Sequence, residues 1–97
     1  MAKYIVLMNW TDQGIETFKG SPARYDEGKE EAAKLGVTLG EIYWTIGPHD
    51  AVLTLDAPDE EALAATLLRI GSAGNVRTTT LRAFTRDEFA RVVDRIG

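Results

Sequence analysis

Four segments of the chain have the apolar alternation and the β-branched and aromatic content that are typical of β-strands. They are residues 3–10, 37–47, 49–57 and 75–84. In the first segment, even-numbered residues 4–10 fall on one face and Ile5 and Leu7 fall on the other, so both faces are apolar. Between the second and third segments, Gly47 and Pro48 predict a hairpin turn.

A helix is predicted between the first two strands, after a short helical piece that starts at Thr11. It has Ser21 as its N-cap, Pro22 at its first position and Gly36 just beyond its end. Gly28 lies inside it, where glycine costs about 1 kcal/mol relative to alanine. This glycine therefore suggests either a kink or close packing.

Two more helices are predicted by spacing and capping residues. One connects the last two strands, begins near Pro58 and has a buried stripe made of Leu63, Leu67 and Ile70. The other closes the chain and opens with a Thr85-x-x-Glu88 capping box. Its apolar residues recur at helical spacing; they are Phe89, Val92, Val93 and Ile96.

This order of elements, β-α-β-β-α-β with an added C-terminal helix, predicts an α+β fold of the ferredoxin-like type. The length predicts one domain, residues 1–97. Two helices cover one face of such a sheet, and the apolar second face needs cover as well. We therefore expect two copies to pack as a dimeric α+β barrel, with the C-terminal helix lying across the partner. In the alternative, a monomer, this helix folds back over its own sheet.

Charge and residue usage narrow the function. The chain has 15 acidic and 11 basic residues, a net charge of -4, and scattered basic positions, so we expect no nucleic-acid partner. No apolar run approaches the roughly 20 residues of a membrane-spanning helix, and the first apolar stretch is too short for a secretory signal. We expect a cytoplasmic protein without a membrane partner. One histidine and no cysteine argue against a metal site, and no motif indicates a cofactor.

The predicted topology brings the end of the first strand, the hairpin corner and the start of the fourth strand to one end of the sheet. We expect a candidate ligand-binding site there; its residues are Asn9, Trp10, Trp44, His49, Asp50 and Arg77. A histidine beside a carboxylate can act as a general base, and Arg77 can hold an anion. Adjacent strand residues point to opposite faces, however, which favours Asp50 as a hairpin residue bonded to backbone. No catalytic residue is assigned.

The tryptophans of this set have two interpretations. Aromatic side chains line small-molecule pockets, but they are more often core or interface anchors. Tyr43 and Trp44 are neighbours on one predicted strand, so only one of them can face the space between two packed sheets if the strand is regular.

Three separated segments resemble those of a known family. They are "NWTDQGI" at residues 9–15, the corner at residues 47–50 and "GNVRTTTLRAF" at residues 74–84. Over nearly the whole chain the sequence is similar to the GYD family, small bacterial and archaeal proteins of unassigned function related to dimeric α/β-barrel proteins. The name-giving motif is Gly-x-Tyr-Asp, and here His49 stands in place of the tyrosine, while Gly47 and Asp50 match.

Three functional hypotheses follow. The first is a small-molecule-binding homodimer with its site near the hairpin at residues 47–50. The second is a cofactor-free enzyme, monooxygenase-like or isomerase-like, which resemblance of fold alone suggests. The third is a structural module that forms higher oligomers through an edge strand, as the threonine run at residues 78–80 between Arg77 and Arg82 favours.

Overall fold

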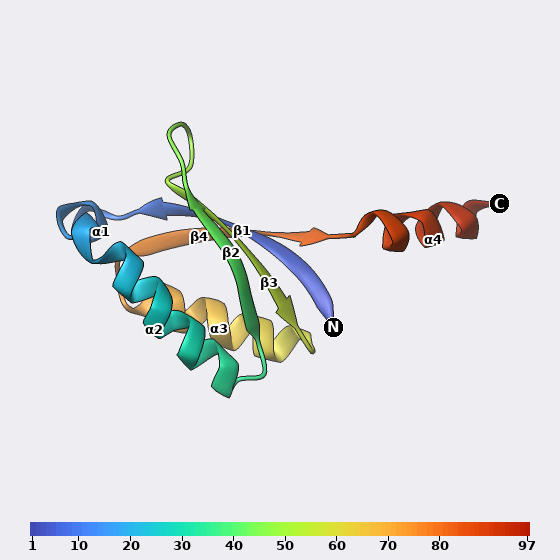
Figure 1. The fold of residues 1–97 in the computed structure, drawn as a ribbon, viewed down its shortest axis with the longest axis horizontal. Coiled ribbons are helices and arrows are strands. Elements are labelled where there is room, and N and C mark those ends of the chain that lie inside the picture. Colours follow the sequence, from blue (N-terminus) through green and yellow to red (C-terminus); the bar gives the residue numbers. More distant parts are fainter.

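The computed structural model describes residues 1–97 and has four strands in one antiparallel sheet, in the order β2-β3-β1-β4 (Figure 1). Its elements are β1 (Ala2–Trp10), α1 (Asp12–Glu16), the 3-10 helix η1 (Phe18–Gly20), α2 (Ser21–Lys34), β2 (Thr38–Trp44), β3 (Ala51–Ala57), α3 (Glu60–Ser72), β4 (Val76–Ala83) and α4 (Arg86–Ile96). This order and pairing confirm the predicted α+β, ferredoxin-like fold.

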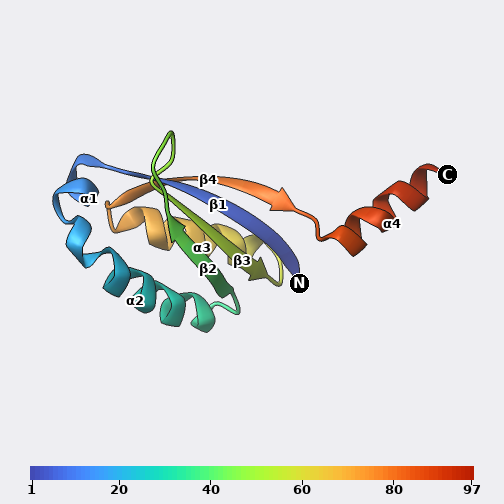
Figure 2. The ribbon, with the colours of Figure 1, turned by 45° about the horizontal axis from the view of Figure 1, so that its top comes forward.

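The core lies between the sheet and helices α2 and α3, which cover the same face (Figure 2). Alternate residues of β1 and β3 point into it, and Val6, Leu53 and Leu55 have almost no exposed surface. Only 11 of the 97 residues are buried, so the chain has a small core for its length. Covering a further apolar surface would add stability.

Helix α3 packs on the sheet through its predicted stripe, of which Leu63 and Leu67 contact the core. Its expected stripe of Leu63, Leu67 and Ile70 is only half-buried, and the buried residue is Thr66. The Thr66 hydroxyl donates a hydrogen bond to the Ala62 carbonyl at 2.9 Å, which satisfies it inside the helix. Thr66 lies between Leu63 and Leu67 on the same stripe, so the predicted face of α3 is the face that packs on the sheet.

Helix α1 packs closely against the start of β4. Thr11 is its N-cap and accepts a hydrogen bond from the Gly14 amide at 3.1 Å. Gly14 is buried, and a Cβ atom placed on it would lie 1.9 Å from the Asn75 carbonyl oxygen. The next helix has Gly20 at its N-cap, so the expected cap Ser21 is instead the first residue of α2.

A β-bulge changes the faces of β2. Leu39 pairs with Leu55 and Ile42 with Leu53, so two residues, Gly40 and Glu41, lie opposite one residue of β3. A Cβ atom on Gly40 would lie 2.4 Å from the Thr54 hydroxyl oxygen, which explains the glycine. Because of the extra residue, positions 39, 42 and 44 all share the helix-covered face of the sheet.

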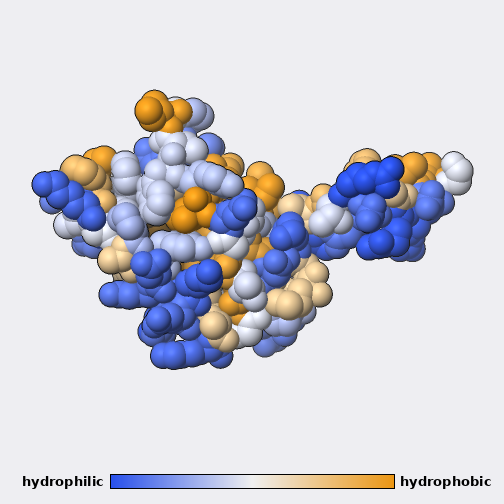
Figure 3. All heavy atoms as spheres, in the orientation of Figure 1, coloured by the Kyte–Doolittle hydropathy of each residue, from blue (hydrophilic) through white to orange (hydrophobic).

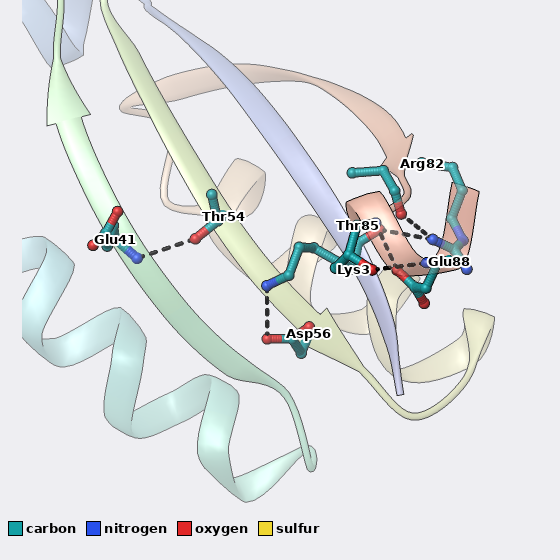
Figure 4. Close-up of polar contacts among 8 residues, drawn as sticks. Lys3, Glu41, Thr54, Asp56, Arg82, Thr85 and Glu88 are labelled. Atoms are coloured by element: carbon teal, nitrogen blue, oxygen red, sulfur yellow. Dashed lines mark hydrogen bonds and ion pairs between the residues drawn. The ribbon is translucent and has the colours of Figure 1, made fainter. Parts of the chain in front are cut away.

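The second face of the sheet, which we call the open face, is not covered by any helix (Figures 1 and 2). Its centre is apolar and contains Ile5, Leu7, Val52 and Leu81, on neighbouring strands β3, β1 and β4. A cross-strand ion pair between Lys3 and Asp56, at 3.2 Å, lies at one end of this face (Figure 4).

Helix α4 extends away from the sheet rather than covering it (Figure 1). In this structure α4 therefore does not fold back over its own sheet. Its capping box is formed as predicted, because Thr85 and Glu88 each accept the other's backbone amide hydrogen (Figure 4). Its expected apolar stripe is exposed, and Figure 3 shows hydrophobic surface on this helix.

No helix of the structure is both long and apolar enough to cross a membrane.

Candidate functional site

A cavity of about 600 Å³ lies between α2, α3 and the helix-covered face of the sheet. Its floor includes Met8, Ile42 and Leu53 from three strands. The wall formed by α2 carries Gly28 and Ala32, one helical turn apart, where larger side chains would fill the space. The cavity therefore exists because α2 presents small side chains above an apolar sheet.

Both tryptophans of the chain line one end of this cavity. Trp10 is the last residue of β1, and Trp44 is the last residue of β2. A second hollow of about 260 Å³ is bordered by the same two tryptophans and by Phe18, Ser21 and Pro22. The two hollows share an aromatic border, which suits contact with an apolar or aromatic ligand.

Charged side chains lie at the rim of the cavity on α2 and α3. Arg69 of α3 bonds to Glu31 of α2 at 2.9 Å, so an ion pair links the two helices across the opening. Arg24, in the first turn of α2, is half-buried and donates hydrogen bonds to the Thr17 carbonyl and the Ser21 hydroxyl, each at 3.0 Å. At the rim, Arg69 thus has a carboxylate partner, whereas Arg24 has none.

The hairpin corner has a separate hydrogen-bond network. The Asn9 side chain donates to the Pro48 carbonyl at 2.8 Å, and its Oδ1 lies 2.9 Å from Nδ1 of His49. The Asp50 carboxylate accepts the Trp10 backbone amide hydrogen at 2.8 Å. Asp50 is therefore held by backbone, while His49 is held by Asn9, and the two neighbours are not hydrogen-bonded as a general-base pair.

The six predicted site residues lie at one end of the sheet but on two sides of it. Trp10 and Trp44 line the cavity on the helix-covered face. Asn9 and Arg77 are paired across β1 and β4 on the opposite, open face, and His49 is bonded to Asn9. The alternation of side chains along β1 separates Asn9 from Trp10.

Tyr43 and Trp44 are separated in the same way. Trp44 lines the cavity, and Tyr43 points to the open face, where its hydroxyl donates to the Glu41 carboxylate at 2.7 Å. This hydrogen bond and the negative charge of Glu41 raise the pKa of Tyr43 above its ordinary value.

Sequence reasoning missed the part of the cavity that comes from α2 and α3. These cavity residues are Ser21, Arg24, Tyr25, Thr66 and Ile70. One signal in the sequence was available, because Gly28 and Ala32 put two small residues on a stripe that includes Tyr25 and Leu35. Small residues on a core-facing stripe leave volume unless an opposite side chain fills it.

Several known proteins are similar to this chain in sequence or in structure. A Thermus thermophilus protein named "Glutamine synthetase and cystathionine beta-lyase binding protein" is 37% identical over 84 residues, which are 86% of this chain and 88% of the relative. The crystal structure of TTHA0845, also from Thermus thermophilus, has a TM-score of 0.56 at 29% identity and covers 88% of this chain and 95% of that one.

Another similar structure is a feast or famine regulatory protein from M. tuberculosis complexed with L-methionine, with a TM-score of 0.68 at 22% identity. The likeness covers 88% of this chain and 51% of that protein, so this chain spans about half of its length. At 22% sequence identity, this structural likeness is evidence for a shared fold alone. The GYD domain matches residues 4–93, which include most of every strand and most of α4. The chain therefore belongs to the GYD domain family.

Proposed function

We propose that this protein is a small-molecule-binding homodimer whose ligand occupies the cavity between α2, α3 and the sheet. The observation that carries the proposal is a space of about 600 Å³ lined by Trp10 and Trp44. Ligand sites in proteins are concave, mostly apolar and of this size, with a few polar groups at fixed positions. The end of this cavity that Trp10 and Trp44 line is the end of the sheet where the sequence predicts a site, on the helix-covered face.

Two observations support the homodimer. The open face has an apolar centre at Ile5, Leu7 and Val52, with polar groups toward its ends, which is the anatomy of a protein interface. The stripe of α4 at Phe89 and Val93 is also exposed, and α4 projects from the sheet edge. In a two-fold dimer, one interface would cover both surfaces in both copies.

The cavity is tested with the neutral fluorescent probe N-phenyl-1-naphthylamine and a variant that fills the space. Gly28→Phe places an aromatic ring beside Leu39, whose Cδ1 lies 4.0 Å from the position of an added Cβ atom. Ala33→Phe, on the exposed side of the same helix, is the matched control. We expect Gly28→Phe to weaken probe binding at least tenfold and Ala33→Phe to leave it within twofold. If both variants bind the probe equally well, the probe does not occupy the cavity.

The dimer is tested with a charge on the open face. Leu7→Glu introduces a carboxylate at the centre of the proposed interface, where burial without a partner is costly. Leu68→Glu, on the exposed surface of α3, is the control. In sedimentation velocity experiments we expect Leu7→Glu to be monomeric and Leu68→Glu to remain dimeric. A dimeric Leu7→Glu protein, or a monomeric wild type, would overturn the proposed assembly.

A second candidate function is the binding of enzymes, which the name of the 37% identical relative favours. The same exposed surfaces, the open face and α4, are available for such a contact in a single copy. Purified glutamine synthetase and cystathionine β-lyase are the partners to try, in biolayer interferometry with the immobilised wild-type chain. Binding that is lost in Leu7→Glu but kept in Gly28→Phe would favour this function over the cavity.

A further inference from the structure

We propose that the ligand of this cavity is an organic anion, with a carboxylate or similar head group bound by Arg24 and an apolar body against Trp10 and Trp44. This inference rests on the proposed small-molecule function and names the class of ligand. It is carried by the position of a half-buried, unpaired arginine beside an aromatic cavity.

Arg24 has no carboxylate partner in the chain. The structure contains four ion pairs, and Arg24 is in none of them. Its hydrogen bonds go to the neutral oxygens of Thr17 and Ser21. A guanidinium group has five N–H donors in a planar fork, so donors remain for a bidentate anion. A charge that is partly withdrawn from water gains more from such a partner than an exposed charge does.

The position of Arg24 connects it to the aromatic end of the cavity. Its Nη2 atom lies 3.0 Å from the Ser21 hydroxyl oxygen, and Ser21 borders both hollows together with Trp10 and Trp44. Arg24 also lies in the first turn of α2, where the helix dipole adds positive potential. A ligand with its head group at Arg24 can therefore place its body against the two indole rings.

The other charged residues at the rim do not cancel the preference of the cavity for an anionic ligand. Arg69 and Glu31 neutralise each other at 2.9 Å. Glu27 and Glu30 are exposed, so water and salt screen them from the interior of the cavity. Arg24 is thus the unpaired ionic group at the rim that is partly shielded from water.

The test uses two probes with the same apolar body. 8-Anilinonaphthalene-1-sulfonate carries an anionic sulfonate, and N-phenyl-1-naphthylamine lacks it. We expect Arg24→Gln and Arg24→Met to weaken binding of the anionic probe about tenfold or more, the usual size of a lost charge-assisted hydrogen bond, with the neutral probe within twofold. Arg24→Lys, which keeps the charge but loses the planar fork, should bind the anionic probe more tightly than Arg24→Gln does and less tightly than wild type, with the neutral probe within twofold.

Arg95→Gln is the control, because it removes the same charge from an exposed position on α4, outside the cavity. It should leave the ratio of the two affinities within twofold. A purely structural Arg24, acting through Thr17, would lower both affinities together and leave their ratio unchanged, which would overturn the anion proposal. If the wild type binds neither probe, or if Gly28→Phe weakens the binding of neither, the probes do not occupy the cavity. The proposed ligand-binding function of the cavity then fails.

A measurement on the wild type covers the case in which neither charge-removing variant folds. Raising NaCl from about 50 to about 500 mM should weaken the anionic probe severalfold and leave the neutral probe unchanged, since only the ionic contact is screened. Equal affinities of the two probes, with no effect of salt on either, would show that no cation contributes to binding and would refute the inference.

Discussion

Replacing Gly14 or Gly28 with alanine is the same chemical change in two helices, yet the structure predicts opposite effects on stability. Helix propensity alone favours alanine at both sites by about 1 kcal/mol, because glycine loses more backbone entropy on folding. At Gly28 the atom nearest to an added Cβ is Leu39 Cδ1 at 4.0 Å, so the new methyl group has space. We therefore expect Gly28→Ala to stabilise the protein by roughly 0.5 to 1 kcal/mol. Of the two explanations that the sequence suggests for Gly28, a kink or close packing, close packing is absent.

At Gly14 the added Cβ would lie 1.9 Å from the Asn75 carbonyl oxygen and 2.8 Å from its carbonyl carbon. Both are backbone atoms, so α1 must move away from β4. That movement breaks the hydrogen bond from the Thr11 amide to the same oxygen, now 3.1 Å long. A lost hydrogen bond of about 1 kcal/mol and an overpacking cost of about 1 to 3 kcal/mol exceed the gain in propensity. We expect a net loss of about 1 to 3 kcal/mol.

Urea unfolding followed by tryptophan fluorescence measures both effects, with calorimetry at one fixed protein concentration as a check. The melting temperature should rise by about 2 to 8 °C for Gly28→Ala and fall by about 4 °C or more for Gly14→Ala. Gly71→Ala in α3, with no atom within 4 Å of the added Cβ, is a control that should follow Gly28→Ala in sign. A Gly14→Ala protein as stable as wild type would refute the packing argument.

Three further predictions concern α4, the hairpin corner and the open face. The pKa of Glu88 is lowered, mainly by its hydrogen bond from the Thr85 backbone amide, so its stabilisation of α4 is present above the ordinary carboxylate pKa and lost as the pH falls through the lowered value. We expect helicity measured by circular dichroism to fall in that acidic range, and Thr85→Ala to lower it already at neutral pH. His49→Ala should leave N-phenyl-1-naphthylamine affinity within twofold, because His49 does not line the cavity; a large loss in fluorescence titration would place the site at the corner. Glu41→Gln should lower the pKa of Tyr43 in an ultraviolet absorbance titration, and an unchanged pKa would show that Glu41 does not cause the shift.

The order of strands and helices could be predicted from the sequence because each signal is local. Alternation in residues 3–10, the capping box at Thr85 and Glu88, and the glycine after α2 depend on neighbours within a few positions. The ferredoxin-like pairing follows from this order, since connection rules leave few topologies for β-α-β-β-α-β. The end of the sheet at which Trp10, Asp50 and Arg77 meet is a consequence of the same topology.

The candidate site itself was decided by contacts between segments far apart in the chain. The bulge at Gly40 and Glu41 places Trp44, rather than Tyr43, beside Trp10 on the helix-covered face. The cavity depends on the distance at which α2 packs over the sheet. A repeating side-chain pattern specifies which residues face inward, but the volume left between them depends on how the layers pack. The sequence by itself thus determined the layers and their order, and only the tertiary structure decided where space remained between them.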